Sequence, residues 1–240
     1  MFLGLTLYTG VSCKQNRTIS KPEEEGIVTL PEPRYSGTLS VEEAIFRRKS
    51  TRYYKDEPLT LQEVSQLLWA AGGKTVDGVT GATRAYPSAG GIYPLEIYLV
   101  AGDVEDLEAG VYRYLWREHA LRMVRGGDLR QSLMGAALRQ GAIGNAPVSL
   151  VFIAIYERTM RKYGERGRVR YVHIDMGGAG QNVYLQAEAL DLGTVAIGAF
   201  YDGAVKEVLG IEDGEPLCIM PIGRNKYTSP QINSVYVVNH

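Results

Sequence analysis

The sequence predicts an α+β domain in which a central sheet is flanked by helices. The chain has 240 residues, of which 45% are hydrophobic, and this is enough for one substantial core. Residues 148–156 form an apolar run that is interrupted only by Ser149, which indicates a strand buried on both faces. Helix and strand patterns are mixed without the strict alternation of a parallel α/β sheet, so the α+β class is favoured.

Two segments with the form of a capping box begin the predicted helices of the N-terminal half. Residues 40–43, Ser-Val-Glu-Glu, predict a short helix that runs to about Lys49. Residues 60–63, Thr-Leu-Gln-Glu, begin a helix with apolar residues at helical spacing, and the Gly-Gly pair at 72–73 ends it. We therefore expect the folded domain to begin near residue 40, after a leader and extended arm over residues 1–39.

The remaining elements follow a glycine-rich loop that runs to Gly91. We expect strands at residues 95–101, 111–115, 121–124, 148–156, 194–200 and 217–222, with the second and third paired as a hairpin. We expect helices after Asp128, around residues 183–190 and at residues 204–209. The folded domain then spans residues 40–225, and residues 226–240 form a C-terminal tail.

The composition argues against two classes of function. Lys and Arg number 26 and Asp and Glu number 27, so the net charge of −1 lacks the basic excess of a nucleic-acid-binding protein. The three His and two Cys show no metal-ligand spacing, so we predict no metal site. Cys218 lies in an apolar run and is expected to be a core residue.

The first twelve residues are mostly apolar and uncharged, and Cys13 follows them. This arrangement resembles the end of a lipoprotein signal, and a lipidated Cys13 would attach the protein to a membrane. The basic segment of such a signal is missing, and the stretch is too short to span a bilayer. The alternative is a simple leader in a cytoplasmic protein, which is the location we favour; export or lipid anchoring stays open.

Residues 47–52, Arg-Arg-Lys-Ser-Thr-Arg, form the first segment with chemical potential. Four cations stand next to two hydroxyl groups, which suits an anion site, because Arg can bind a phosphate through two parallel N–H bonds. The alternative is a solvated basic helix end, which the helix dipole would favour.

Three further segments place small residues or a cation next to predicted strand ends. Residues 86–94, Tyr-Pro-Ser-Ala-Gly-Gly-Ile-Tyr-Pro, would allow backbone to approach a flat ligand closely. Residues 193–200 end in small side chains, and Arg224 follows the last core strand, which is a rigid place for a phosphate-binding side chain. Each of these segments can also be an ordinary loop or strand end.

A fifth segment has a dinucleotide-binding pattern. Residues 169–175 can be interpreted as a strand, with the glycine-rich residues 177–183 and then Asp202 after it. Val183 stands where the pattern requires its final Gly. The same small residues fit a helix that packs closely against another helix, and we prefer that interpretation.

The first four segments, in this order, resemble the FMN-dependent nitroreductase family over about residues 40–224. The closest similarity is to its SagB-like dehydrogenase branch. The motifs that carry it are Arg48-Lys49-Ser50-Thr51-Arg52, Pro87-Ser88-Ala89-Gly90-Gly91-Ile92-Tyr93-Pro94, Tyr163-Gly164-Glu165-Arg166, Gln181-Asn182, Gly198-Ala199-Phe200 and Pro221-Ile222-Gly223-Arg224. The resemblance implies an α+β fold with a mixed or antiparallel sheet and a homodimer with two FMN sites at the interface.

The resemblance also implies roles for individual residues. The phosphate, ribityl chain and pyrimidine edge would be held by Arg48, Lys49, Ser50 and Arg52, with Arg224 completing the phosphate site. Pro87, Ser88 and Gly90 would approach the isoalloxazine from the partner subunit, and Gly198 and Ala199 would lie near its N5 atom. In the SagB-like branch a Lys-Tyr pair serves in proton abstraction, and Lys162-Tyr163 resembles that pair; the alternative for Lys162 and Tyr163 is a basic helix face with a packing Tyr.

Three functions follow from these expectations. The leading one is an FMN oxidoreductase that takes hydride from NADH or NADPH and reduces a small nitroaromatic, quinone or flavin-like acceptor in turn at one site. The second is a SagB-like dehydrogenase that oxidises an azoline or related group on a peptide. The third is a flavin-binding protein without turnover.

Overall fold

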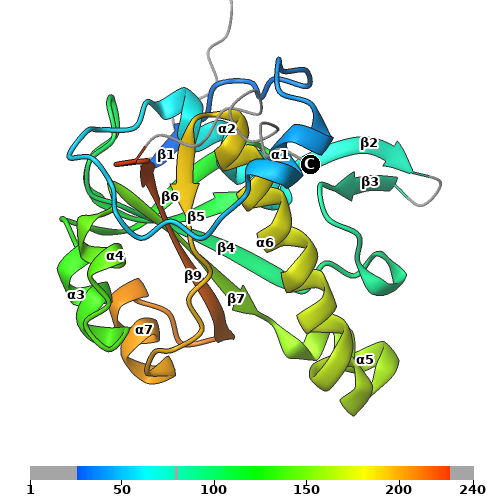
Figure 1. Cartoon of the computed structure of the whole chain (residues 1–240). Coiled ribbons are helices and arrows are strands. Elements are labelled where there is room, and N and C mark those ends of the chain that lie inside the picture. The colour runs from blue at the N-terminus through cyan, green and yellow to red at the C-terminus, as the bar shows by residue number, and fades with distance from the viewer. Residues whose placement is uncertain (1–25, 79–80, 228–240) are drawn as a thin grey trace, which may run out of the picture.

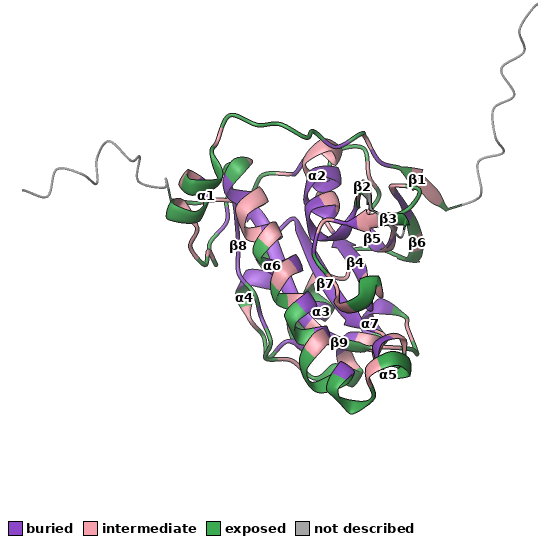
Figure 2. Cartoon of the chain, turned by 90° about the vertical axis from the view of Figure 1, so that its right-hand side faces the viewer, coloured by how far each residue is buried: buried purple, intermediate pink, exposed green. Residues whose placement is uncertain are grey.

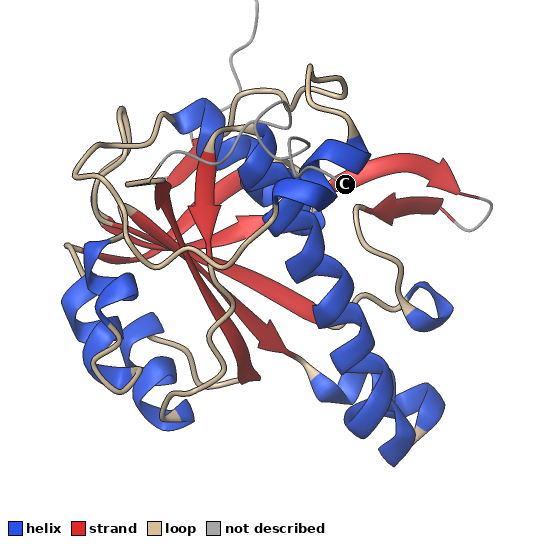
Figure 3. Cartoon of the chain, in the orientation of Figure 1, coloured by secondary structure: helices blue, strands red, loops and turns tan. Residues whose placement is uncertain are grey.

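The computed structural model describes residues 26–78 and 81–227, and these residues show the α+β architecture that the sequence predicts. A seven-stranded antiparallel sheet has the order β1-β6-β5-β4-β7-β9-β8, and β2 and β3 form a separate hairpin. Helices lie on both faces of the large sheet (Figures 1 and 3).

The strands are β1 (Ile27–Thr29), β2 (Lys74–Gly78), β3 (Gly81–Arg84), β4 (Leu95–Ala101), β5 (Gly110–Leu115), β6 (Ala120–Gly126), β7 (Val148–Ala154), β8 (Leu192–Thr194) and β9 (Glu215–Arg224). The helices are α1 (Val41–Arg47), α2 (Leu61–Gly72), the 3-10 turn η1 (Ala89–Gly91), α3 (Arg130–Ala136), α4 (Gly141–Asn145), α5 (Tyr156–Tyr163), the π-helix η2 (Gly167–Tyr171), α6 (Val172–Ala189) and α7 (Asp202–Leu209).

Alternate residues of the central strands face two separate cores. In β4, Leu95, Ile97 and Leu99 belong to the core under α2 and α6, whereas Tyr98 and Val100 belong to the core under α3, α4 and α7. All seven residues of β7 are buried, which explains why six of them are apolar and why Ser149 is the only polar residue of that strand. Figure 2 shows these central strands as the buried layer between the helices. The long helix α6 lies across the same face of the sheet as α2, and the residues of the candidate site lie along it.

The two predicted capping boxes begin helices as expected. Thr60 Oγ1 accepts the Glu63 amide at 3.2 Å, and the Thr60 amide donates to the Glu63 carboxylate at 2.8 Å, so α2 has a complete capping box. Ser40 Oγ accepts the Glu43 amide at 3.1 Å and caps α1. The predicted hairpin of the second and third strands is also confirmed, as β5 paired with β6.

Three segments differ from the sequence-based expectation. The glycine-rich region contains the hairpin β2–β3, where the hydroxyls of Thr75 and Thr83 share a hydrogen bond of 2.8 Å. The strand expected at residues 194–200 ends at Thr194, because the chain then leaves the sheet as a loop that returns in one bridge between Ile197 and Ile219. Residues 169–175 are helical, since η2 leads directly into α6. The strand required by a dinucleotide-binding motif is therefore not formed, and that interpretation is wrong.

The N-terminal arm is tied to the body more closely than an exposed segment would be. β1 pairs with β6, and Leu30 is 4% exposed. His119 Nε2 lies 2.8 Å from Ser65 Oγ and 3.1 Å from the carbonyl oxygen of Pro31, and its Nδ1 lies 2.8 Å from the Tyr114 hydroxyl. Burial lowers the pKa of His119, which favours the neutral ring in this contact. The expected start of the domain near residue 40 leaves out this edge strand.

Other expectations concern the ends of the chain and its buried thiol. Cys13, the leader and residues 228–240 lie outside the described residues, so lipid attachment and location stay predictions. No helix of the described residues is long and apolar enough to cross a membrane. Cys218 is buried, as expected, and burial raises the pKa of its thiol to about 11.

Candidate functional site

Tyr184, on the C-terminal half of α6, joins two of the predicted segments. Its hydroxyl lies 3.1 Å from Ser50 Oγ and accepts the Ala196 amide at 2.8 Å. The Arg48 guanidinium lies over the Tyr184 ring, 5.2 Å from its centroid. The structure thereby brings the basic segment 47–52 against the loop that carries Gly198 and Ala199, both of which are exposed.

The basic segment lines a small pocket of about 150 Å³. Its walls are Lys49, Ser50, Thr51, Arg52, Tyr53, Asn225 and Tyr227. Thr51 Oγ1 and Asn225 Oδ1 are buried without a hydrogen-bond partner among the described residues. Cationic and hydroxyl side chains at one pocket suit a ligand that is anionic and also carries polar groups.

A buried carboxylate holds the start of this segment. Glu188 on α6 is 6% exposed and accepts a hydrogen bond from the Lys49 amide. Burial raises the pKa of Glu188, and the hydrogen bond with Lys49 opposes that rise. The segment is therefore fixed to α6 at two places, Glu188 and Tyr184.

The N-terminal half of α6 holds a different segment, the turn at residues 88–91. Ser88 Oγ donates to Asp175 Oδ2 at 2.5 Å and accepts the Tyr93 amide at 2.9 Å. Gly90 and Gly91 both have a φ of 65°, which is the left-handed region that favours glycine. Pro87 lies beside α6 as well, because a Cβ placed on Gly178 would be 3.6 Å from Pro87 Cδ.

Lys162 and Tyr163, at the end of α5, lie over this turn. A Cβ placed on Gly90 would be 2.8 Å from Lys162 Nζ and 2.7 Å from the Tyr163 hydroxyl, so a side chain there would have to displace the ends of these two side chains. The Tyr163 ring packs edge-on against Tyr171, with centroids 4.9 Å apart. The structure thus places the predicted Lys-Tyr pair directly against the predicted ring-facing glycine, within one chain.

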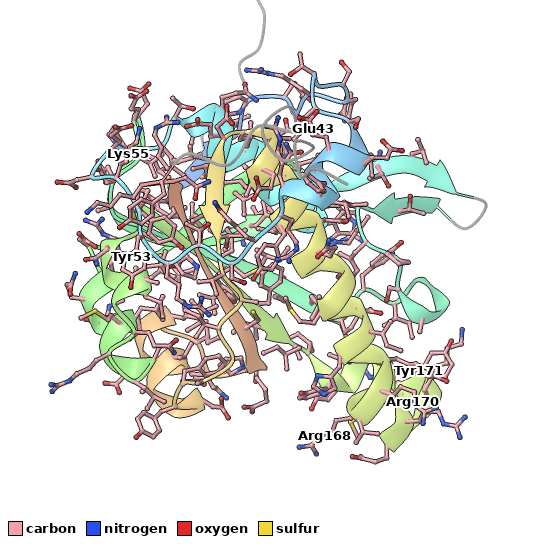
Figure 4. All side chains as sticks on the ribbon, in the orientation of Figure 1. Glu43, Tyr53, Lys55, Arg168, Arg170 and Tyr171 are labelled. Atoms are coloured by element: carbon pink, nitrogen blue, oxygen red, sulfur yellow. The ribbon has the colours of Figure 1, made fainter. Side chains whose placement is uncertain are left out.

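Residues 156–171, which form α5, η2 and the turn between them, make a strongly basic arm that carries this pair. Four exposed arginines surround Lys162 in this arm: Arg161, Arg166, Arg168 and Arg170. Figure 4 shows Arg168, Arg170 and Tyr171 at the free end of this arm. The exposed arginines are what the alternative of a basic helix face predicts for Lys162. The contact of Lys162 with Gly90 is the observation that favours a chemical role.

A buried cation supports the turn from the sheet side. Arg84 is 6% exposed and donates to the carbonyl oxygens of Gly72 at 2.6 Å and Leu95 at 3.0 Å. Its guanidinium also lies 5.1 Å from the ring centroid of Tyr86 and 5.3 Å from that of Trp116. Burial lowers the pKa of Arg84. Through its two hydrogen bonds, the Arg84 side chain links the chain before the turn, at Gly72, to the chain after it, at Leu95.

Arg224 makes a different set of contacts from the one expected for a phosphate ligand. Its two terminal nitrogens donate to the two oxygens of Glu63, at 3.0 and 3.1 Å, and its Nε lies 3.5 Å from Glu57. Glu63 is also the capping-box residue of α2. The charge of Arg224 is therefore already matched in the chain, and a ligand phosphate would have to compete with Glu63 for it.

The candidate residues form two groups at the two ends of α6. One group contains Arg48, Lys49, Ser50 and Arg52 with Gly198, and the other contains the turn at 88–91 with Lys162. Their anchors on the helix, Tyr184 and Asp175, are separated by about 14 Å along the axis at 1.5 Å per residue. Within one chain, the residues predicted to bind the anion are therefore separated from the turn predicted to face the ring.

Comparison with known proteins decides the family. Residues 45–224 match the nitroreductase family as a whole. The chain belongs to the nitroreductase family. Its predicted membership and its predicted fold are thereby confirmed, and the protein is an oxidoreductase of the nitroreductase type.

Individual relatives of this nitroreductase cover most of the chain. It is 45% identical over 186 residues to a nitroreductase-type protein of Methanocaldococcus jannaschii, covering 78% of this chain and 91% of the relative. A solved nitroreductase-type structure from Ralstonia eutropha is 32% identical, with a TM-score of 0.73 over 85% of this chain and 91% of that chain. The microcin B17-processing protein McbC of Escherichia coli is 30% identical over 136 residues, which span 54% of this chain and about half, 49%, of McbC.

Sequence reasoning missed the residues that anchor the nitroreductase site. Tyr184 and Glu188 lie in the helix expected around residues 183–190, and Asp175 lies in the segment that could also have been a strand; none of the three was singled out. The one signal available was the pair of carboxylates, since a buried carboxylate requires a partner. Arg84 lies in the region expected to be a glycine-rich loop, and nothing in the spacing indicates its burial.

Proposed function

We propose that this nitroreductase binds FMN between two copies of the chain and works as an NAD(P)H-driven oxidoreductase. The observation that carries the proposal is the separation of the two residue groups along α6. A two-fold axis beside the middle of α6 would place the turn at 88–91 of one chain near the basic segment of the partner chain. One complete site would then form at each end of the paired helices.

The outer face of α6 supports such a pairing. Ile174 is 60% exposed, Gly177 and Gln181 are exposed, and a Cβ on Gly177 would meet nothing within 4 Å. Beside this face, Val41 and Ile45 of α1 are 65% and 55% exposed. A groove of about 310 Å³ runs between α1, α2 and α6, and its apolar walls include Leu39, Val41, Ala44, Trp69, Ala70 and Leu185. A permanent dimer needs a large interface with an apolar centre, and a second copy on this face would provide it.

The residues present fit FMN in charge and shape. Arg48, Lys49, Ser50 and Arg52 would hold the phosphate and the polar chain, with Arg224 completing the phosphate site if it exchanges Glu63 for the ligand. Gly198 and Ala199 would leave room beside the ring, and Pro87, Ser88 and Gly90 of the partner chain would approach it. Bound FMN supplies hydride transfer, and the protein supplies position and charge.

The proposed reaction uses one open site for two substrates in turn. NADH or NADPH is the donor, and a nitroaromatic, quinone or flavin-like molecule is the acceptor. The purified protein should be yellow, with an FMN spectrum, and anaerobic mixing with NADH or NADPH should bleach it. A colourless protein that takes up no FMN would contradict the proposal. A yellow protein that neither donor bleaches would favour the non-catalytic flavin-binding alternative.

The interface can be tested with two matched glycines. Gly177 on α6 and Gly135 on α3 are exposed helix positions where a Cβ meets nothing within 4 Å. Gly177→Glu should place charge in the interface and yield a monomer that binds FMN at least about tenfold more weakly. Gly135→Glu lies on the opposite face of the sheet and should stay dimeric and yellow. Light scattering and FMN titration measure both properties, and a monomeric wild-type protein that binds FMN would contradict the shared site.

The contact of Lys162 and Tyr163 with Gly90 favours a second candidate, a SagB-like dehydrogenase that removes hydrogen from an azoline on a peptide. The similarity to McbC, a microcin-processing protein, supports the same candidate. Such a reaction needs a base, whereas hydride leaves a nicotinamide without one. We expect Lys162→Ala to change NAD(P)H-driven bleaching by less than about tenfold, short of the loss of a true general base. A hundredfold loss with FMN still bound would favour the second candidate.

A further inference from the structure

Asp175 is a buried carboxylate beside the candidate site, and the roles proposed above do not use it. It is 2% exposed, in the first turn of α6. Ser88 Oγ donates to its Oδ2 at 2.5 Å, and the Ala89 amide also donates to the carboxylate. Burial raises the pKa of Asp175, and these two hydrogen bonds and the charge of Arg84 oppose the rise.

Asp175 is the acceptor in these hydrogen bonds. Ser88 Oγ accepts the Tyr93 amide and donates its own proton to Asp175. The Ala89 amide can only donate. An ionised carboxylate accepts both bonds, whereas a carboxamide or a protonated carboxyl group has less acceptor capacity and brings donors of its own.

The turn that Asp175 holds is the surface against which the Lys-Tyr pair rests. Gly90 has a φ of 65°, and Lys162 Nζ and the Tyr163 hydroxyl lie over it, 2.8 and 2.7 Å from where a Cβ would be. A shift of this turn therefore changes the surface on which the ends of these two side chains rest. The hydrogen bonds from Tyr93 through Ser88 to Asp175 close the turn and hold Gly90 in this conformation.

We propose that Asp175 is a positioning residue, which acts through the Ser88–Gly91 turn to set the position of the Lys162-Tyr163 pair. The inference rests on the proposed function only in taking this turn as the ring-facing surface. The charged and titratable groups that interact with the carboxylate are Arg84 on β3 and Tyr86 before the turn, whereas Lys162 and Tyr163 on α5 lie on the other side of the turn, beside Gly90. Asp175 itself touches no substrate in this arrangement.

The test compares two buried carboxylates of the same helix. Asp175→Asn and Glu188→Gln each replace a carboxylate that accepts a backbone amide, at opposite ends of α6. An amine-reactive label is applied to the protein as purified, and mass spectrometry gives the labelling rate of Lys162 relative to the exposed Lys55. Both lysines are exposed, so the ratio reports the surroundings of the Lys162 amine beside Gly90 and Tyr163 rather than its burial. We expect Asp175→Asn to change this ratio about fivefold in either direction, the effect of losing one charged hydrogen bond under the turn, and Glu188→Gln to leave it within about twofold. An unchanged ratio in Asp175→Asn, or an equal change in both variants, would overturn the proposal.

Two further measurements separate positioning from general loosening. Ser88→Ala should change the ratio in the same direction as Asp175→Asn does, whereas Ser88→Thr, which keeps the hydroxyl, should restore it; this pair also serves if Asp175→Asn does not fold. As the pH falls and Asp175 takes up a proton, the wild-type ratio should approach that of Asp175→Asn, and the ratio in Asp175→Asn should not show this change. Failure of the Thr rescue or a pH-independent wild type would count against Asp175. The labelling needs no turnover, so it gives a result even if the protein proves to hold no FMN.

Discussion

The two ends of α6 hold different kinds of charge. At the N-terminal end, Arg84 and Asp175 are both buried, and both form hydrogen bonds with other groups of the same chain. At the C-terminal end, Arg52 is exposed and Arg48 and Lys49 are half-buried, while Tyr184 and Glu188 below them supply the fixed contacts. At the first end the buried pair fixes the shape of a glycine turn, and the exposed cations of α5 and η2 lie outside it. At the second end the accessible cations of residues 48–52 lie above the buried carboxylate of Glu188 and are available to an anionic ligand. The difference predicts that equivalent substitutions will affect stability at one end and ligand affinity at the other.

The largest effect is expected from Arg84→Met. The change leaves the buried carbonyl oxygens of Gly72 and Leu95 without donors and removes the contacts with two aromatic rings. We expect a loss of about 3 kcal/mol in the free energy of unfolding. Arg48→Met, at the other end, should cost less than about 0.5 kcal/mol. Urea denaturation of both variants measures this, and equal losses would remove the distinction between the two ends.

The next effect concerns affinity. We expect Arg52→Ala to weaken FMN binding by about 2 kcal/mol, since it removes one charge-assisted bond, with no loss of stability. Arg224→Ala should weaken binding by about 1 kcal/mol, because the wild-type side chain must first leave Glu63, and it should also destabilise the fold. FMN titration with parallel unfolding curves separates the two. Identical behaviour of both variants would show that the Glu63 contact does not compete with the ligand.

The sequence predicted the elements that local rules determine and the segments that carry the family motifs. The capping boxes at Thr60 and Ser40 and the doubly buried strand β7 follow from short-range pattern. The hairpin β2–β3 was missed because its glycines indicate a loop, and the pairing that forms it depends on the fold around it. Arg84 and Asp175 could not be placed, since burial of a charge is decided by contacts distant in sequence. Arg224 was placed at the end of the correct strand, but its pairing with Glu63, 161 positions away, is a tertiary contact.

A smaller effect should follow from Tyr184→Phe. The Ala196 amide loses its acceptor and Ser50 loses its partner, so the basic segment is held less firmly. We expect FMN affinity to fall by about 1 kcal/mol. Tyr112→Phe is the matched control, because the Tyr112 hydroxyl donates to the carbonyl oxygen of Glu108 away from α6. Its affinity for FMN should equal that of the wild type, and a similar fall in both variants would mean that Tyr184 has no special part in the site.

The smallest effect concerns pH, and here the two ends of α6 should behave alike. Burial raises the pKa of both Asp175 and Glu188 above that of an exposed carboxyl group, so the folded chain binds more protons than the unfolded chain between the two values. Protonation of Asp175 weakens its hydrogen bonds with Ser88 and Ala89, but the cost of burying the charge is the larger effect. Each group therefore adds stability at acidic pH, and that contribution is lost as the pH rises through the folded-state pKa. Glu188→Gln and Asp175→Asn each remove one such titration, so the stability of the wild type relative to either variant should fall between pH 4 and pH 7. Urea unfolding at these two pH values tests the sign, and a relative stability that rises with pH for one variant would show that hydrogen bonds outweigh burial at that end of the helix.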